Sequence, residues 1–187
     1  MMKETVDTLA NQKKINYALN GSFTRNNFIK ELTDELPEPP AYFPSNVKLN
    51  QQGYLDLDKI IENSSKPLNV NDFKTLAKNT DTLILDVRHQ DDFKDGYVPS
   101  SIFVGLKGGF APWVGSVIKN VDQNILLVCE SGQENEAITR LSRVGFDNVI
   151  GYLNGGFNSW RSSGEQIEKI ESITATDLEK ILPLIHI

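Results

Sequence analysis

The chain has 187 residues, a formal net charge of -6 and a sequence pI of about 5.0. Hydrophobic residues make up 39% and charged residues 24%, which supplies a packed core and excludes global disorder. The acidic balance argues against general binding to nucleic acid or to an anionic membrane, because both need an excess of Lys and Arg.

The sequence contains no apolar run near the roughly 18 residues that a membrane-spanning helix needs. Residues 1–14 lack the apolar segment of a secretory signal. The single cysteine, Cys129, cannot form an internal disulfide, which favours a reducing, cytoplasmic setting. Two scattered histidines, His89 and His186, are too few for a structural zinc site, so we expect no metal.

The first third of the chain is predicted to be helical and then irregular. Helical spacing of apolar residues predicts helices over residues 1–20 and 24–36. A cluster of prolines ends the second helix, because proline lacks the backbone N–H and restricts the residue before it. The stretch 41–54 is expected to be an irregular surface strap with aromatic anchors.

After residue 66, short apolar runs alternate with amphipathic stretches. Apolar runs of strand length predict buried strands, at 82–87, 102–106, 124–129 and 149–153. Helical patterns predict helices between and after them, at 70–78, 110–119, 134–144 and 157–162. This alternation predicts an α/β sandwich with a mainly parallel central sheet.

The pattern of apolar and polar residues divides the chain into three parts. Residues 1–66 are an N-terminal helical and irregular arm, and residues 67–164 are the α/β domain. Residues 165–187 are a linker with the start of a following unit, since a helix signal is followed at 184–187 by what reads as an unfinished strand. We therefore expect the chain to be a middle piece of a multidomain protein.

Cys129 lies where a predicted buried strand turns into a helix. In parallel α/β sheets ligands bind at the carboxyl ends of strands, beside helix N-termini. Successive N–H groups in such a turn, together with the helix dipole, favour an anion and lower a thiol pKa. The alternative is a buried structural cysteine, because a free cysteine also behaves as a small hydrophobic residue.

Three segments, LILDVRHQDDFKDGYVPSSI, ILLVCESGQENEAITRLSRVGFDNV and YLNGGFNSW, together resemble the rhodanese family over about residues 67–164. The resemblance implies a three-layer α/β sandwich. It also implies that Cys129 takes a sulfane sulfur from a donor, holds it as a persulfide and passes it to a thiol acceptor without a cofactor. The cradle for the sulfur anion would be the backbone N–H groups of five loop residues, Glu130, Ser131, Gly132, Gln133 and Glu134.

This loop departs from the family pattern, which often places arginines where Glu130 and Glu134 stand. Nearby like charges raise a thiol pKa and repel a dianion. We therefore expect thiosulfate to be a poor substrate, and a small-molecule or protein persulfide to be the donor. Phosphatase chemistry on the same fold is disfavoured, since phosphate is also a dianion.

Polar residues near the predicted strand ends are expected to support the loop. Arg88 and Asp92 are predicted to form a structural ion pair, and Asp86 to brace the end of the sheet by hydrogen bonding. His89 is interpreted as a solvated loop residue, and Trp113 as an anchoring aromatic.

The segment before residue 66 resembles the tail of the metallo-β-lactamase-fold domain in persulfide-dioxygenase-like proteins fused to rhodanese units. The implied partners are adjacent domains of the same full-length chain, a persulfide donor and a thiol acceptor, with a homodimer also possible. The second hypothesis is a catalytically inert rhodanese-like module for docking or dimerisation, which the acidic loop motivates.

Overall fold

The computed structural model describes residues 6–34, 36, 39–40 and 42–181. The chain divides into two units, residues 1–39 and 40–187. The first unit contains two helices, α1 (Leu9–Ile15) and α2 (Arg25–Thr33), each begun by a threonine side chain that accepts a hydrogen bond from a helix N–H. Both helices are shorter than predicted, and neither has a buried residue.

The second unit is built on a five-stranded parallel sheet with strand order β1-β5-β4-β2-β3. Its strands are β1 (Pro67–Leu68), β2 (Thr82–Asp86), β3 (Ile102–Phe103), β4 (Asn124–Val128) and β5 (Val149–Leu153). Its helices are α3 (Phe43–Gln52), α4 (Leu57–Ser64), α5 (Val70–Ala77), α6 (Gln90–Asp95), α7 (Phe110–Val117), α8 (Glu134–Ser142), α9 (Gly156–Ser162) and α10 (Ala175–Ile181).

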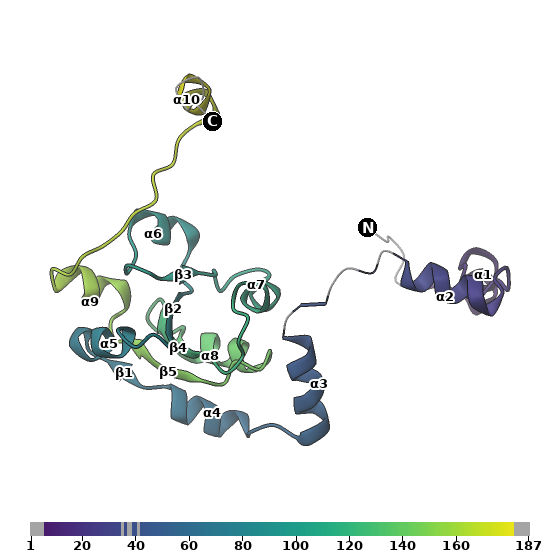
Figure 1. Cartoon of the computed structure of the whole chain (residues 1–187), viewed down its shortest axis with the longest axis horizontal. Coiled ribbons are helices and arrows are strands. Elements are labelled where there is room, and N and C mark those ends of the chain that lie inside the picture. The colour runs from purple at the N-terminus through teal and green to yellow at the C-terminus, as the bar shows by residue number, and fades with distance from the viewer. Residues whose placement is uncertain (1–5, 35, 37–38, 41, 182–187) are drawn as a thin grey trace. The chain divides into compact units, whose positions relative to one another are not determined.

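Helices cover both faces of this sheet, which confirms the predicted three-layer α/β sandwich (Figure 1). On one face, side chains from α4, α7 and α8 pack against Leu85 and Leu127. On the other face, Phe73 of α5 and Trp160 of α9 pack against Leu126 and make an edge-to-face ring contact. The apolar runs of β2 and β4 reflect this burial on both sides.

The prediction that residues 41–54 are irregular is wrong, because the structure has α3 there. Pro44 in the first turn has a backbone angle preset for a helix, and Gly53, at φ +89°, ends it. Tyr42, just before α3, is 9% exposed, and its ring lies where a side chain on Gly115 of α7 would be. The packed unit thus extends upstream of the boundary predicted at residue 66.

Three further elements were not predicted: α4, α6 and β1. Asp56 caps α4 by accepting a hydrogen bond from the amide of Asp58, and Ile60 buries the helix against the sheet. The strand predicted to begin near residue 184 lies outside the described residues.

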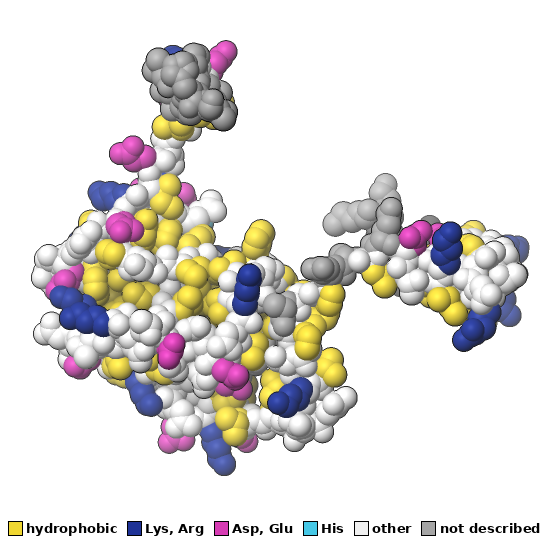
Figure 2. Space-filling view, viewed as in Figure 1, with side chains coloured by type: hydrophobic (Ala, Val, Ile, Leu, Met, Phe, Trp, Pro, Cys, Tyr) yellow, Lys and Arg dark blue, Asp and Glu magenta, His cyan; other side chains and the backbone are white. Residues whose placement is uncertain are grey.

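The outer surface of the second unit mixes charges of both signs with hydrophobic side chains on the face seen in Figure 2. Within the described part of the chain, no helix is long and apolar enough to cross a membrane.

Candidate functional site

Cys129 is the first residue after β4, at the carboxyl end of the sheet. β4 lies beside β2, with Val128 in register with Asp86, and the Val87 N–H donates to the Val128 carbonyl at 2.9 Å. Cys129 is 2% exposed and belongs to the core on the α8 side of the sheet. The structure therefore places the thiol at the strand end predicted from the sequence, but beneath the surface.

The loop after Cys129 turns within four residues and then enters α8. The turn is closed by a hydrogen bond from the Gln133 N–H to the Glu130 carbonyl at 3.0 Å, and Gly132 has φ +88°. Of the five amides expected to cradle a sulfur anion, that of Gln133 is thus used by the turn itself. Among the described residues, the amides of the other four donate to no protein acceptor; they belong to Glu130, Ser131, Gly132 and Glu134.

The turn from β5 into α9 packs against the backbone of Cys129. Gly156 has φ +59°, and a Cβ atom there would stand 2.7 Å from the carbonyl oxygen of Cys129. Glycine is required here for two reasons: residues with a side chain disfavour this positive φ, and the carbonyl of Cys129 occupies the space that a Cβ atom would need. Gly156, the first residue of α9, thus lets the backbone pack closely against the carbonyl of Cys129.

The sequence predicts two opposing effects on the thiol pKa, a lowering by the turn and a raising by Glu130 and Glu134, and the raising effect prevails in the structure. Burial, and then the carboxylates of Glu134, Asp86 and Glu130 in that order, together raise the pKa of the Cys129 thiol to about 12. Removing a thiolate from water costs free energy, and three nearby negative charges oppose its formation. At neutral pH the thiol is therefore protonated almost all the time.

Arg88 pairs with Asp86 and not with Asp92, which corrects the predicted ion pair. Its Nη2 atom donates to Asp86 Oδ2 at 2.7 Å and to the Gly96 carbonyl at 2.8 Å, and its Nε atom donates to Asp86 Oδ1 at 3.0 Å. The guanidinium carbon also lies 4.3 Å from the ring centroid of Phe157. Asp92 is exposed on α6, and the side chain that this helix buries is that of the next residue, Phe93.

Asp86 itself is fully buried, and the prediction that it braces the sheet end by hydrogen bonding is confirmed. Burial raises the pKa of its carboxyl above the ordinary value, even though the bonds to Arg88 act in the opposite direction. The buried pair joins the end of β2 to the loop before Tyr97, and so holds the strand next to Cys129 in place.

A cavity of about 340 Å³ opens beside the cysteine loop. Its wall combines the loop after β2, the start of α6, the segment after β3 and two residues of the cysteine loop, Glu130 and Gln133. His89 lies in this wall, exposed, with Nδ1 3.4 Å from Asp91 Oδ2, as expected for a loop residue. Trp113 lines a neighbouring cavity of about 350 Å³ and is 64% exposed, so it is not the anchoring aromatic that was predicted.

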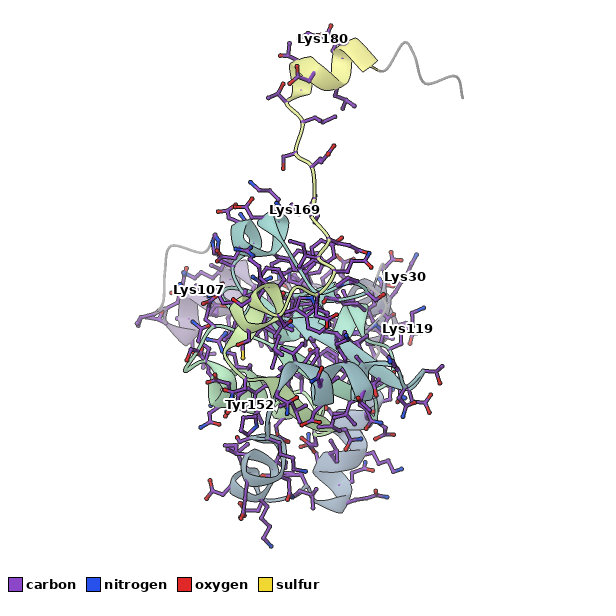
Figure 3. All side chains as sticks on the ribbon, turned by 90° about the vertical axis from the view of Figure 1, so that its left-hand side faces the viewer. Lys30, Lys107, Lys119, Tyr152, Lys169 and Lys180 are labelled. Carbon is purple, nitrogen blue, oxygen red and sulfur yellow. The ribbon has the colours of Figure 1, made fainter. Side chains whose placement is uncertain are left out.

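Two residues near the site were missed by sequence reasoning, Lys107 and Tyr152, both labelled in Figure 3. Lys107 follows β3 and lines both cavities. Tyr152 lies on β5, and its phenol pKa is raised by burial first and then by the charges of Glu134 and Cys129, so it lies near the thiol. Neither forms part of a recognisable motif, and only the fold brings Lys107 beside the cysteine loop and Tyr152 near the thiol.

Within the described ranges, no group of three or more His, Cys, Asp or Glu side chains is arranged to hold a metal ion.

Comparison with known proteins agrees with this geometry. The family model described as the Rhodanese-like domain matches residues 69–163, which cover β2 to α9 and the cysteine loop. The chain belongs to the rhodanese-like family. Membership of this family supports a relationship to sulfurtransferases and sulfur carriers.

The rhodanese-like region also has individual relatives. The uncharacterized protein YibN of Escherichia coli K12 is 30% identical over 93 residues, which are 49% of this chain and 63% of YibN. The Rhodanese_3-like domain of the Alr3790 protein from Anabaena is 21% identical with a TM-score of 0.45, over 50% of this chain and 98% of that domain.

A longer structural likeness is to a metallo-β-lactamase from Staphylococcus aureus. It is 25% identical with a TM-score of 0.57, over 79% of this chain and 40% of that protein. The matched share of this chain exceeds the family domain alone.

Proposed function

We propose that this rhodanese-like domain carries or transfers sulfane sulfur through a persulfide on Cys129. The observation that carries the proposal is the position of the thiol, at the carboxyl end of a central parallel strand and before a loop in which four of the five amides donate to no acceptor in the described part of the chain. Such amides stabilise a developing sulfur anion in the way that an oxyanion hole stabilises an oxyanion.

The transfer would proceed in two displacements without net oxidation. The Cys129 thiolate attacks the outer sulfur of a donor R–S–SH, the new S–S bond forms at Cys129, and the donor's S–S bond breaks to release R–S⁻. An acceptor thiolate then attacks the outer sulfur of the Cys129 persulfide, which returns Cys129 to the thiolate. The proton that leaves Cys129 at the start is available to the departing thiolate.

The donor is proposed to be a persulfide rather than thiosulfate. The carboxylates of Glu134, Asp86 and Glu130 all act on the thiol, and Arg88 is already paired with Asp86. A thiosulfate dianion would approach this negative field without a free arginine to offset it, whereas a protonated persulfide carries no such penalty.

The whole protein is proposed to be a multidomain, cytoplasmic sulfur-handling protein in which adjacent domains supply or accept the sulfur, with a homodimer also possible. The likeness to the S. aureus metallo-β-lactamase supports this setting, because it spans most of this chain but only 40% of that protein. The metal chemistry of a metallo-β-lactamase fold is not proposed for this chain.

The function is tested by a sulfide-release assay on the full chain with glutathione persulfide as donor and an excess of acceptor thiol, because a second acceptor thiol displaces sulfide from the acceptor persulfide and leaves the acceptor disulfide. We expect turnover that is lost in Cys129→Ser, and turnover with thiosulfate at least tenfold lower. The absence of Cys129-dependent turnover with persulfide donors would refute the proposal.

The second candidate is an inert docking module, and a specific observation favours it: the thiol is 2% exposed and its pKa is raised to about 12. Alkylation by iodoacetamide separates the candidates. An inert module leaves Cys129 unreactive in the folded protein even in the presence of a persulfide donor, whereas a carrier becomes labelled on the outer sulfur after incubation with the donor.

A further inference from the structure

The cavity beside the cysteine loop carries an unusual distribution of charge. Glu130 lies in its wall from the cysteine loop, Asp92 from α6 and Lys107 from the segment after β3. All three side chains are exposed, and none of them has an ion-pair partner within 4.0 Å in the described residues. Their charges are therefore available to a ligand.

The other polar side chains with ionisable groups in this wall already have protein partners. Arg88 is bound to the buried Asp86 and to a backbone carbonyl. His89 faces Asp91, with 3.4 Å between Nδ1 and Oδ2. The free charges of the cavity are thus one ammonium and two carboxylates, which complement a ligand that has one carboxylate and one ammonium of its own.

We propose that this cavity binds the zwitterionic amino-acid group of a small thiol or of its persulfide, with Lys107 paired to the ligand carboxylate and Asp92 and Glu130 to its ammonium. The inference rests on the proposed function, since it names the class of donor or acceptor that the site takes. A volume of about 340 Å³ is within the range of small-molecule sites. Glu130 and Gln133 belong both to this wall and to the loop that follows Cys129, so the bound amino-acid group lies beside the cysteine loop.

The same arrangement selects against other thiols. An anionic thiol with no ammonium gains contact with Lys107 but meets two carboxylates. A cationic thiol with no carboxylate leaves Lys107 unpaired and meets its like charge. Discrimination between these ligands is expected to be moderate, because exposed ion pairs each contribute about 0.2–1 kcal/mol, or up to about fivefold in affinity.

The test uses unreactive probes and the full chain. S-methylcysteine is the zwitterion, N-acetyl-S-methylcysteine keeps only the carboxylate, and S-methylcysteamine keeps only the ammonium. Dissociation constants come from NMR titration of the ¹⁵N-labelled protein, read from the amide signals of Lys107 and Glu130. We expect the zwitterion to bind about threefold or more tightly than either singly charged probe.

Two variants with the same change of charge give the decisive comparison. Lys107→Glu should weaken binding of the zwitterion about threefold to tenfold. Lys119→Glu, on the loop after α7 and in the wall of neither cavity, should leave its affinity unchanged (both lysines are labelled in Figure 3). Equal affinities for the three probes, equal effects of the two variants, or signal changes confined to another part of the chain would each overturn the inference.

This outcome is separable from that of the proposed function, because the probes have no thiol and transfer no sulfur. Selective binding of S-methylcysteine together with an inactive Cys129 would refute sulfur transfer and retain the ligand site. Cys129-dependent turnover with no preference for the zwitterion would retain transfer and refute the ligand site.

Discussion

Replacing Glu134 with glutamine removes the carboxylate that most strongly opposes ionisation of the Cys129 thiol. Burial is the first cause of the thiol pKa of about 12, and Glu134 is the first of the three charges that add to it. Glu134→Gln leaves the size of the side chain and the buried position of Cys129 unchanged. The variant therefore changes the charge at the site and little else.

The size of the expected fall in the Cys129 thiol pKa follows from the position of Glu134. A charge in the immediate neighbourhood moves a pKa by about 1–3 units. Glu134 is half-buried in the first turn of α8, so water screens it and the lower end applies, about 1 unit. At pH 8 a thiol of pKa about 12 is ionised to about one part in 10⁴, and a fall of about 1 unit multiplies that fraction by about ten.

The assay is the rate of iodoacetamide alkylation of Cys129 between pH 7 and pH 10. The thiolate is the reactive form, so the rate of the unmodified protein should rise about tenfold per pH unit across this range without a plateau. The Glu134→Gln protein should follow a parallel line about tenfold higher. Glu136→Gln is the matched control, because Glu136 is in the same helical turn but is exposed and paired with Arg140 at 2.8 Å.

A plateau below pH 9 in the unmodified protein would refute the argument, because it would show a thiol pKa near or below the ordinary value. Equal acceleration in Glu134→Gln and Glu136→Gln would also refute it, since the effect would then come from the helix terminus and not from proximity to the thiol. Thermal unfolding of both variants checks that each remains folded, as the loss of one acidic residue in a first turn costs only about 0.3–1 kcal/mol.

Three further outcomes are expected. Gly156→Ala should destabilise the fold by about 1–3 kcal/mol in urea unfolding, because its Cβ would meet the carbonyl oxygen of Cys129. Gly164→Ala is the control and should cost less, because Gly164 has a similar φ of +75° but nothing within 4 Å of an added Cβ. Tyr42→Ala should lower the free energy of unfolding by about 2–4 kcal/mol, because the Tyr42 ring is buried against α7. Phe43→Ala, whose side chain is 47% exposed, should lower it by less than about half as much. Equal losses would show that the segment around Tyr42 is not part of the packed unit. Stability should fall between about pH 9 and pH 12, because the folded state holds the proton of Cys129 more tightly than the unfolded chain does, and Cys129→Ser should remove this part of the pH dependence.

Local patterns carried the prediction of the central fold. The apolar runs of β2, β4 and β5 are strand-length and buried, and the amphipathic stretches before and between them form α5, α7 and α8. These elements follow from the period of a few neighbouring residues, which the sequence displays directly. The prediction of an irregular segment at 41–54 failed because Tyr42, just before α3, packs against Gly115 of α7, and no local pattern records that contact.

By itself, the sequence determined the parallel α/β architecture and the position of Cys129 at the end of β4, because both depend on residues close together along the chain. Only the tertiary structure decided the character of that thiol. The thiol is buried by residues from several elements, and the carboxylates that act on it, Asp86 and Glu134, come from β2 and α8. The pairing of Arg88 with Asp86 and the positions of Lys107 and Tyr152 likewise depend on how strands and loops pack together. Desolvation and Coulomb interactions depend on distances in space, so the sequence presented opposing effects of the turn and of its glutamates on the thiol pKa, and only the fold decided that this pKa is raised.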